Sequence, residues 1–184
     1  MNKIISLFRR DYVGDHLVYD EIVAGAEWVV VGEGVATQKF DGTCCLVRHG
    51  RLFRRHDAKG GRTPPVDFVP VQDPDPVTGH WPGWVPVGDG PGDRWHREAL
   101  EARVDTFADG TYELCGPRIG GNPEQFGTHR LVRHGIIELP DCPRTFGALR
   151  AYLGVHDIEG IVWHHPDGRM VKIKGRDFGI QRPR

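Results

Sequence analysis

The chain has 184 residues, 39% of them hydrophobic, and a formal net charge of −1. This length suits one domain with a buried core and is too short for two domains of ordinary size. The near-neutral charge excludes a global basic field, so any nucleic-acid-binding surface has to be a local patch. Only a short apolar stretch precedes Arg9 and Arg10, too short for a signal-peptide core or a membrane span, and we expect a cytosolic protein.

The cysteines and histidines show no spacing typical of a metal site. The four cysteines are Cys44, Cys45, Cys115 and Cys142. None of them belongs to a C-x-x-C pair, so we expect reduced thiols and no zinc site. His164 and His165 are adjacent, and adjacent residues of a strand point to opposite faces, so they cannot hold one ion together. We interpret both, together with His129 and His134, as surface or turn residues.

Short runs rich in β-branched or aromatic residues predict antiparallel sheet in the first third of the chain. These runs are residues 27–32, 35–39, 43–49 and 51–55. His49-Gly50 fits a tight hairpin turn between the last two runs.

Residues 60–93 form a segment rich in proline, glycine and tryptophan. Eight of the fourteen prolines lie between Pro64 and Pro91, which argues against regular structure and predicts an unusually long loop. Two interpretations stay open at this point. The segment is either a surface loop fixed by Trp81 and Trp84 or a lid that faces the substrate.

Two helices are predicted in the second half of the chain. Asp93 can cap a helix that begins near Arg94. Its apolar residues at helical spacing are Trp95, Ala99, Leu100, Val104 and Phe107. After a strand at residues 111–115, a second helix is predicted from about 143 to 153, with Gly154 as its C-terminal cap. The buried stripe of this second helix consists of Phe146, Leu149 and Leu153.

The last part of the chain predicts a hairpin around a Pro166-Asp167-Gly168 turn. In its second strand, Val171-Lys172-Ile173-Lys174 alternates strictly, so both lysines lie on one face of the sheet. A solvent-facing edge strand would show the same pattern.

Glu159 belongs to the partner strand, and the turn decides which face it shares. If the turn is closed by pairing His164 with Arg169, or Pro166 with Arg169, Glu159 lies on the face of the two lysines. A three-residue loop reverses that relation. One carboxylate and two ammonium groups on one face can bind a phosphate and a divalent metal together.

Lys39 stands beside Phe40 and Gly42 and close to several valines, without other charges than Asp41. An amine becomes a nucleophile only when its pKa is lowered, either by desolvation or by a nearby cation. A lysine at the mouth of an apolar sheet, close in space to Lys172 and Lys174, would meet both conditions.

Lys39-Phe40-Asp41-Gly42 resembles the K-x-D-G motif of the covalent nucleotidyltransferases, which comprise DNA ligases, RNA ligases and messenger-RNA capping guanylyltransferases. Four further matches follow in the order of that superfamily. They are Arg54 or Arg55 on the next strand, YELCGP around Glu113, EGIVW at residues 159–163 and VKIKG at residues 171–175. Together the five matches span most of the chain.

Details of the sequence favour one branch of this superfamily. Residues 111–135 and the TGHWPGW segment resemble a small family of ATP-dependent 5′-to-3′ RNA ligases related to the phage RNA ligase 1 group. DNA ligases and capping enzymes usually carry an arginine where this chain has Cys44. They also continue into an OB-fold domain, whereas ten residues follow Lys174 here, so we expect no C-terminal OB-fold.

The resemblance implies an α+β fold: a single nucleotidyltransferase (adenylation) domain over residues 1–184, with antiparallel sheets, a few flanking helices and an ATP-grasp-like ligase topology. Residues 60–93 would be an insertion in it. The implied reaction has three steps. A lysine attacks the α-phosphate of ATP, the AMP passes to an RNA 5′-phosphate, and a 3′-hydroxyl displaces it.

The same resemblance assigns roles to individual residues. Lys39 is the expected nucleophile, with Lys172 and Lys174 as α-phosphate clamps. Glu159 is the expected ligand of Mg²⁺, with Mn²⁺ as the alternative ion.

Other residues are expected to contact the nucleotide. Arg54 or Arg55 would contact phosphate, and only one of them can point inward because they are adjacent on a strand. Glu113 would bind the ribose. The adenine would stack on Ile136, with backbone groups near Gln38 reading its edge.

Three alternatives remain beside the RNA ligase interpretation. The chain could be a self-adenylylating transferase with another acceptor, a DNA ligase-like enzyme, or a nucleotide-binding domain without turnover. The expected partners are ATP and RNA with 5′-phosphate and 3′-hydroxyl ends, and we expect a monomer without a membrane association.

Overall fold

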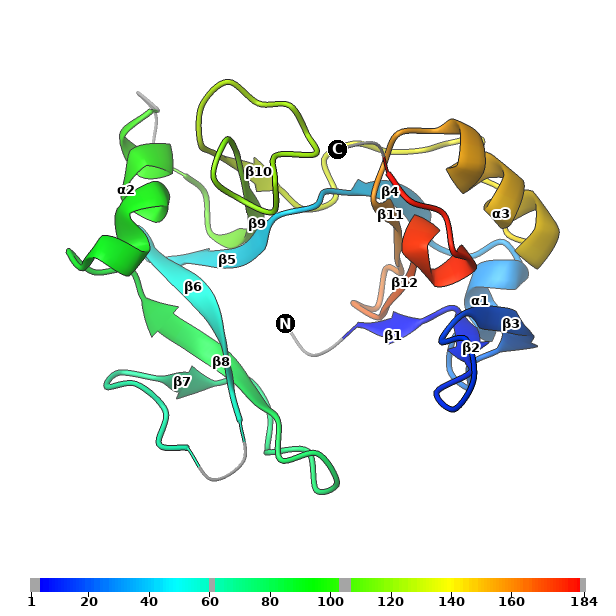
Figure 1. Cartoon of the computed structure of the whole chain (residues 1–184), viewed down its shortest axis with the longest axis horizontal. Helices are drawn as coiled ribbons and strands as arrows, with labels where there is room; N and C mark the ends of the chain where they lie inside the picture. Colours follow the sequence, from blue (N-terminus) through cyan, green and yellow to red (C-terminus); the bar gives the residue numbers. More distant parts are fainter. Residues whose placement is uncertain (1–3, 60–61, 103–106, 183–184) are drawn as a thin grey trace. The chain divides into compact units, whose positions relative to one another are not determined.

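The computed structural model describes residues 4–59, 62–102 and 107–182, which form two compact units (Figure 1). The first, called the four-stranded unit here, consists of residues 4–40 and 135–182, and the second, the six-stranded unit, of residues 41–134. Both combine mostly antiparallel sheet with few helices. The α+β class predicted from the sequence is therefore confirmed, while the single-domain arrangement and the ATP-grasp-like topology stay predictions.

The sheet of the four-stranded unit has the order β1-β12-β11-β4. These strands are β1 (Ile5–Ser6), β12 (Met170–Lys174), β11 (Gly160–His164) and β4 (Val35–Lys39). β1 is parallel to β12, and the other neighbours are antiparallel. Further elements are the β2–β3 pair (Phe8–Arg10 and Val18–Ile22), α1 (Glu27–Val30), α3 (Phe146–Val155) and the 3-10 helix η2 (Gly175–Phe178).

One face of this sheet is packed and the other carries charge. Ile161, Trp163 and Ile173 are fully buried and join the same core cluster as Leu149 and Leu153 of α3. Burial of such side chains stabilises the fold by about 1.5–3 kcal/mol each. Because strand side chains alternate, residues with the opposite parity, among them the lysines of β4 and β12, are directed to the other face.

The six-stranded unit has the sheet order β10-β9-β5-β6-β8-β7. In chain order its elements are β5 (Thr43–Arg48), β6 (Arg51–Ala58), β7 (Val69–Pro70), β8 (Trp81–Pro86), the 3-10 helix η1 (Pro91–Asp93), α2 (Arg94–Glu101), β9 (Gly110–Cys115) and β10 (Arg130–Arg133). α2 packs through Ala99 against a sheet face that includes Cys45, Tyr112 and Leu114.

The turn between β5 and β6 follows the sequence prediction. Arg48 pairs with Arg51, so the loop has only His49 and Gly50. Both have positive φ, at 52° and 71°, as a two-residue turn with the twist of the flanking strands requires. All four cysteines are thiols, as the sequence predicts.

The segment at residues 60–93 is more regular than the prolines indicated. β8 pairs with β6 from Ala58↔Trp81 to Phe53↔Pro86. Trp84 is buried and the Trp81 indole N–H donates to the Gln72 carbonyl at 2.9 Å. Both tryptophans therefore anchor a sheet strand, and the prediction of one long loop is wrong within the described residues 62–93.

Two local predictions need correction. Residues 27–30 form helix α1 instead of a strand, because Trp28 and Val29 pack into the core while Val31 is exposed. Tertiary packing outweighs the β propensity of the valines here. α3 continues past Gly154 and has His156 as its C-cap.

Helix α2 does begin at Arg94, but the Asp93 side chain does not cap it. Its carboxylate instead accepts from the Gly88 N–H at 2.9 Å and pairs with Arg54. α2 ends at Glu101, so Phe107 lies outside it and packs edge-on against Tyr112. Val104, predicted for the same helical stripe, lies outside the described residues.

Candidate functional site

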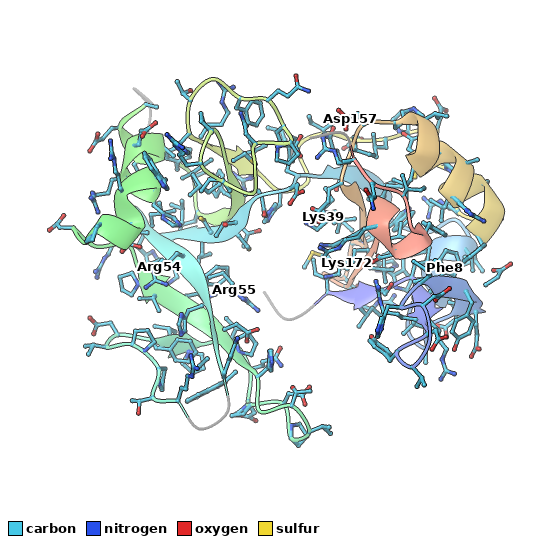
Figure 2. All side chains as sticks on the ribbon, viewed as in Figure 1. Phe8, Lys39, Arg54, Arg55, Asp157 and Lys172 are labelled. Carbon is cyan, nitrogen blue, oxygen red and sulfur yellow. The ribbon has the colours of Figure 1, made fainter. Side chains whose placement is uncertain are left out.

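Three lysines lie on the open face of the four-stranded sheet. Lys39 of β4 and Lys174 of β12 are both cross-strand partners of Gly160 in β11, and Lys172 is the partner of Val162. Cross-strand partners project to the same face, so the three ammonium groups gather opposite the core; Figure 2 shows Lys39 and Lys172 on their strands. The alternation in β12 predicted the placement of Lys172 and Lys174 correctly.

Glu159 bridges two of these lysines. Its Oε2 accepts from Lys39 Nζ and its Oε1 from Lys174 Nζ, both at 2.5 Å. The Lys39 ammonium also donates to the Phe40 carbonyl at 3.2 Å. Gly160, between the two lysines, has no room for a side chain, because a Cβ there would lie 2.1 Å from the Ile173 carbonyl oxygen.

Of the two hairpin registers left open by the sequence, the structure has the one in which Glu159 and the two lysines differ in parity. His164 pairs with Met170, so five residues separate the strands and every pair joins two positions of the same parity, even with even or odd with odd. By this register Glu159 has the parity of the core face. Its carboxylate still reaches Lys39 and Lys174. Glu159 precedes the first residue of β11, and its carbonyl accepts from the Gly175 N–H at 2.9 Å.

The charges in this lysine cluster shift two pKa values. Burial alone would raise the pKa of Glu159, but the charges of Lys39 and Lys174 and their hydrogen bonds lower it below its usual range. Burial and the charges of Lys174 and Lys39 lower the pKa of Lys172 to about 8, against smaller opposing effects of Asp177 and Glu159. Glu159 is therefore ionised, and Lys172 is a cation that its surroundings disfavour.

The cluster has an excess of positive charge. Lys39 and Lys174 share one carboxylate, and Lys172 forms no hydrogen bond or ion pair with any residue that the structure describes. Asp177 does not compensate it directly, because its carboxylate binds Arg10 and the Lys174 backbone N–H. Such a cluster is suited to an anionic ligand, and a phosphate would supply the missing negative charge.

Arg54 and Arg55 lie on opposite faces of the six-stranded sheet. Arg54 pairs with Cys45 of the α2 face and its Nε lies 2.9 Å from Asp93. Arg55 lies over the Trp84 ring at 5.1 Å. Glu113 pairs with Cys44 and so projects away from the α2 face. Arg55, and not Arg54, therefore shares the face of Glu113.

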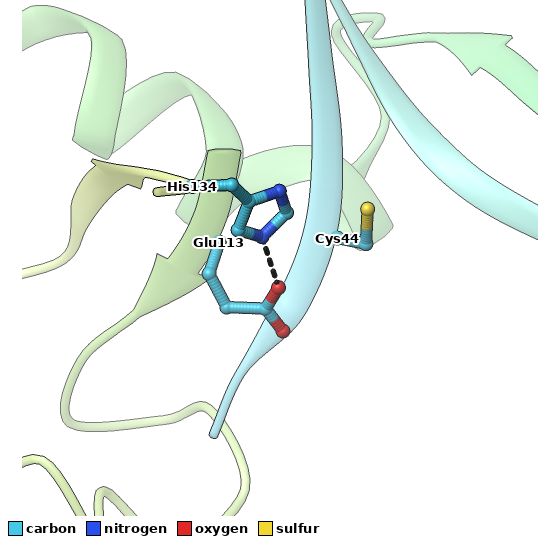
Figure 3. Close-up of side chains that lie close together, drawn as sticks. All are labelled: Cys44, Glu113 and His134. Atoms are coloured by element: carbon cyan, nitrogen blue, oxygen red, sulfur yellow. Dashed lines mark hydrogen bonds and ion pairs between the residues drawn. The ribbon is translucent and has the colours of Figure 1, made fainter. Parts of the chain in front are cut away.

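Glu113 lies beside His134, which we predicted to be a surface or turn residue. His134 Nε2 is 2.8 Å from Glu113 Oε2 (Figure 3). The other ring nitrogen, Nδ1, is 3.0 Å from Thr111 Oγ1. Cys44 completes the group. These residues come from neighbouring strands but lie far apart in the sequence, so no spacing in the chain could have indicated them.

A cavity of about 360 Å³ lies in the six-stranded unit, next to the turn of β5 and β6. Its lining includes Arg48, Arg51, Phe53 and Phe68. The guanidinium carbons of Arg48 and Arg51 lie 5.4 and 5.9 Å from the centroid of the Phe53 ring. Phe53 is buried and Phe68 is half-buried, while Arg48 and Arg51 are exposed. The two cations can contact a phosphate, and a partly exposed aromatic ring can contact a base.

The two residues expected near the adenine belong to the four-stranded unit. The Gln38 backbone N–H already donates to the Ile137 carbonyl at 2.9 Å, and by alternation its side chain lies on the core face. Ile136 is 62% exposed and thus accessible for stacking. The adenine contacts of both residues stay predictions.

Part of the chain matches a family of known proteins. A family model described as RNA ligase 1 matches residues 93–184, which is 92 of the 184 residues. The match includes Glu113, Glu159, Lys172 and Lys174. It begins after Lys39, which therefore lies outside it.

Individual relatives extend the match over more of the chain. RNA ligase 1 of Rattus norvegicus is 27% identical over an alignment 226 residues long, which covers 83% of this chain and 70% of the relative. RNA ligase 1 of Mus musculus is 27% identical, with coverage of 83% and 69%. RNA ligase 1 of Danio rerio is 28% identical over 138 residues, which cover 57% of this chain and 42% of the relative.

The α+β fold and the surplus of lysine charge define a protein suited to a phosphate-bearing ligand. The chain belongs to the RNA ligase 1 family. This membership supports a ligase activity. None of the helices in the described residues is long and apolar enough to cross a membrane.

Proposed function

We propose that the protein is an ATP-dependent RNA ligase that forms a covalent lysine-AMP intermediate on Lys39. It then transfers AMP to an RNA 5′-phosphate and seals this end to a 3′-hydroxyl. The observation that carries the proposal is the cluster of Lys39, Glu159, Lys172 and Lys174 on one sheet face. Membership of the RNA ligase 1 family supports it.

In the first step the Lys39 Nζ attacks the α-phosphate of ATP and pyrophosphate leaves. The ammonium must first leave its ion pair with Glu159 and lose a proton, because only the neutral amine is a nucleophile. Lys172 and Lys174 then offset the charge that builds up on the phosphate oxygens. Burial and the charges of Lys174 and Lys39 lower the pKa of Lys172. Lys172 is well suited to this task, since a bound phosphate would offset these positive charges.

Glu159 fits the role of a Mg²⁺ ligand. Its carboxylate is ionised and each of its oxygens accepts only one lysine hydrogen bond, which leaves acceptor capacity for a hard cation. A bound Mg²⁺, or Mn²⁺, would supply further charge neutralisation for the pyrophosphate. On the protein side, Glu159 also fixes the positions of Lys39 and Lys174.

Two of the contacts expected from the sequence belong to residues of the six-stranded unit. Glu113 is the proposed ribose ligand, and Arg55 is the proposed phosphate contact because it shares the face of Glu113. For RNA, the cavity beside Arg48, Arg51 and Phe53 offers two cations and an aromatic ring. Single-stranded nucleic acid is commonly bound by this combination of charge and stacking.

The experiment is incubation with α-labelled ATP and Mg²⁺, followed by addition of 5′-phosphorylated RNA or DNA. We expect a labelled protein adduct that Lys39→Ala abolishes and that Lys59→Ala, at an exposed lysine, leaves intact. Discharge by RNA but not by DNA is expected, with the 2′-hydroxyl as the discriminating group. A parallel incubation with GTP tests the base preference.

Each other outcome identifies an alternative. Absence of any adduct would contradict every covalent mechanism and leave a nucleotide-binding protein without turnover. An adduct that DNA discharges equally well would indicate a DNA ligase-like enzyme. An adduct that neither nucleic acid discharges would indicate a self-adenylylating transferase with a different acceptor.

A further inference from the structure

Cys44, Glu113 and His134 form a compact group of three potential metal ligands in the six-stranded unit. Their ligand atoms all lie within 4.8 Å of one another (Figure 3). Cys44 of β5 and Glu113 of β9 are direct cross-strand partners. His134 directly follows β10, and its backbone N–H continues the ladder by donating to the Thr111 carbonyl at 3.1 Å. The three side chains are thus positioned by a paired sheet and not by a loose loop.

The histidine is oriented in a manner typical of metal ligands. Thr111 Oγ1 lies 3.0 Å from Nδ1, while Nε2 faces the Glu113 carboxylate at 2.8 Å. When Nδ1–H donates to the hydroxyl, the lone pair of Nε2 points at a carboxylate oxygen. At 2.8 Å the two atoms share a proton, so a metal ion would have to displace this proton and move the two side chains slightly apart. An oxygen atom that fixes the second ring nitrogen is a frequent companion of metal-bound histidine.

The donor set selects the kind of ion. A thiolate, an imidazole and a carboxylate are the three protein ligand types of Zn²⁺, and three protein ligands leave one coordination position open. Mg²⁺ prefers oxygen ligands alone, so it should favour Glu159 over this group. Glu113 is buried, whereas Cys44 and His134 are half-buried and remain accessible to an incoming ion.

We propose that Cys44, Glu113 and His134 bind a Zn²⁺ ion. Binding replaces the thiol proton of Cys44 by the metal and releases that proton to solvent. The bound ion also occupies the carboxylate of Glu113. Zn²⁺ therefore competes with the nucleotide, a consequence that rests on the proposed function because it requires Glu113 to contact the ribose.

Direct binding tests the site independently of activity. Zn²⁺ is titrated into the metal-free wild type, Cys44→Ser and His134→Ala by calorimetry, and Co²⁺ is used as a spectroscopic probe of thiolate ligation. His80→Ala is the matched control, because His80 also pairs with a carboxylate, Asp57 at 3.0 Å, but on the exposed surface. Circular dichroism checks that each variant is folded.

We expect one Zn²⁺ per chain in the wild type and in His80→Ala. In Cys44→Ser and His134→Ala the affinity should fall at least about tenfold, and the thiolate-to-cobalt absorption should be absent from Cys44→Ser. Absence of binding by the wild type, or binding that Cys44→Ser leaves unchanged, would overturn the proposal.

The competition is tested separately by labelling with ATP. Zn²⁺ at saturating concentration should slow adduct formation by the wild type at least about tenfold and slow Cys44→Ser much less, each relative to its own rate with a chelator. Bound Zn²⁺ without any effect on the wild-type adduct would overturn the competition. A protein that binds Zn²⁺ but never forms an adduct would contradict the proposed ligase function and not the zinc site.

Discussion

The lysine cluster of the four-stranded unit and the Glu113 group of the six-stranded unit have opposite electrostatic character. Around Glu159, three half-buried lysines gather near one carboxylate, which pairs with two of them. Around Glu113, a carboxylate faces an imidazole nitrogen and a cysteine. The first arrangement lacks negative charge and the second is completed by a cation. The comparison shows how two sheets of similar construction can be prepared for ligands of opposite sign.

The largest expected effect on stability follows from removing the Glu159 carboxylate that bridges two of the lysines. Glu159→Gln leaves Lys39 and Lys174 without their counter-charge in a mostly buried position. Loss of one partner from a buried ion pair is strongly unfavourable, and with partial exposure we expect a loss of about 2–4 kcal/mol in the free energy of unfolding. Urea denaturation measures this change.

The matched control is Glu21→Gln, which breaks the exposed pair of Glu21 with Arg9. It should change the free energy of unfolding by less than about 0.5 kcal/mol. Equal losses in both variants would show that the lysine cluster is no more strained than an ordinary surface pair.

Removing a cation from the same cluster should have the opposite effect on stability. Lys172→Met keeps most of the aliphatic stem and removes the charge that its neighbours disfavour. We expect a gain of about 1–2 kcal/mol in the free energy of unfolding, after allowance for partial exposure. Adduct formation with labelled ATP should fall at least about tenfold. A destabilised variant with unchanged adduct formation would refute the anion-binding role of Lys172.

This difference between wild type and Lys172→Met should depend on pH. The pKa of Lys172 is about 8 in the folded protein, below its ordinary value of 10.5. Between these values the unfolded chain binds more protons than the folded one, so wild-type stability rises with pH in this window. The advantage of Lys172→Met should be complete below pH 8 and vanish towards pH 10.5, as denaturation at several pH values would show. A constant difference would mean that the Lys172 pKa is not lowered by folding.

The smallest effect is expected at the cavity of the six-stranded unit. Replacing Arg48 and Arg51 by alanine removes both cations beside Phe53. We expect the apparent affinity for 5′-phosphorylated RNA to fall about fivefold, or about 1 kcal/mol, as for the loss of exposed cation–π contacts. The rate of adduct formation with ATP should stay unchanged, and Arg150→Ala on α3 serves as a surface control. Equal sealing kinetics in all proteins would exclude this cavity from RNA binding.

The lysine cluster was more predictable from the sequence than the Glu113 group. A strict alternation placed Lys172 and Lys174 on one face, and this local rule holds in β12. Glu159 was linked to them for only one of two open registers, and the structure has the other one. Glu159 still forms its ion pairs with Lys39 and Lys174, from a position just outside β11.

The Glu113 group depends on the order β10-β9-β5 in the sheet. Strand order is set by packing of the whole unit, so no local pattern could join Cys44, Glu113 and His134. The orientation of Arg54 and Arg55 has the same cause. Their alternation was predictable, but the face covered by α2 decided which of them shares a side with Glu113.

Strand β8 and helix α1 show where local propensities mislead. The prolines of residues 81–86 argued against a strand, yet Trp84 is buried there and β8 pairs with both β6 and β7. The valines near residue 30 argued for a strand, yet burial of Trp28 and Val29 forms a short helix. In both segments large apolar side chains determine the backbone more strongly than propensity does.

Lys39 is the residue that we propose to carry AMP during catalysis. The most direct measurement is peptide mapping by mass spectrometry after incubation of the protein with ATP and Mg²⁺. We expect AMP on the peptide that contains Lys39, with Lys59, Lys172 and Lys174 unmodified. AMP attached to any other residue, or no AMP on a folded protein that binds ATP, would contradict it.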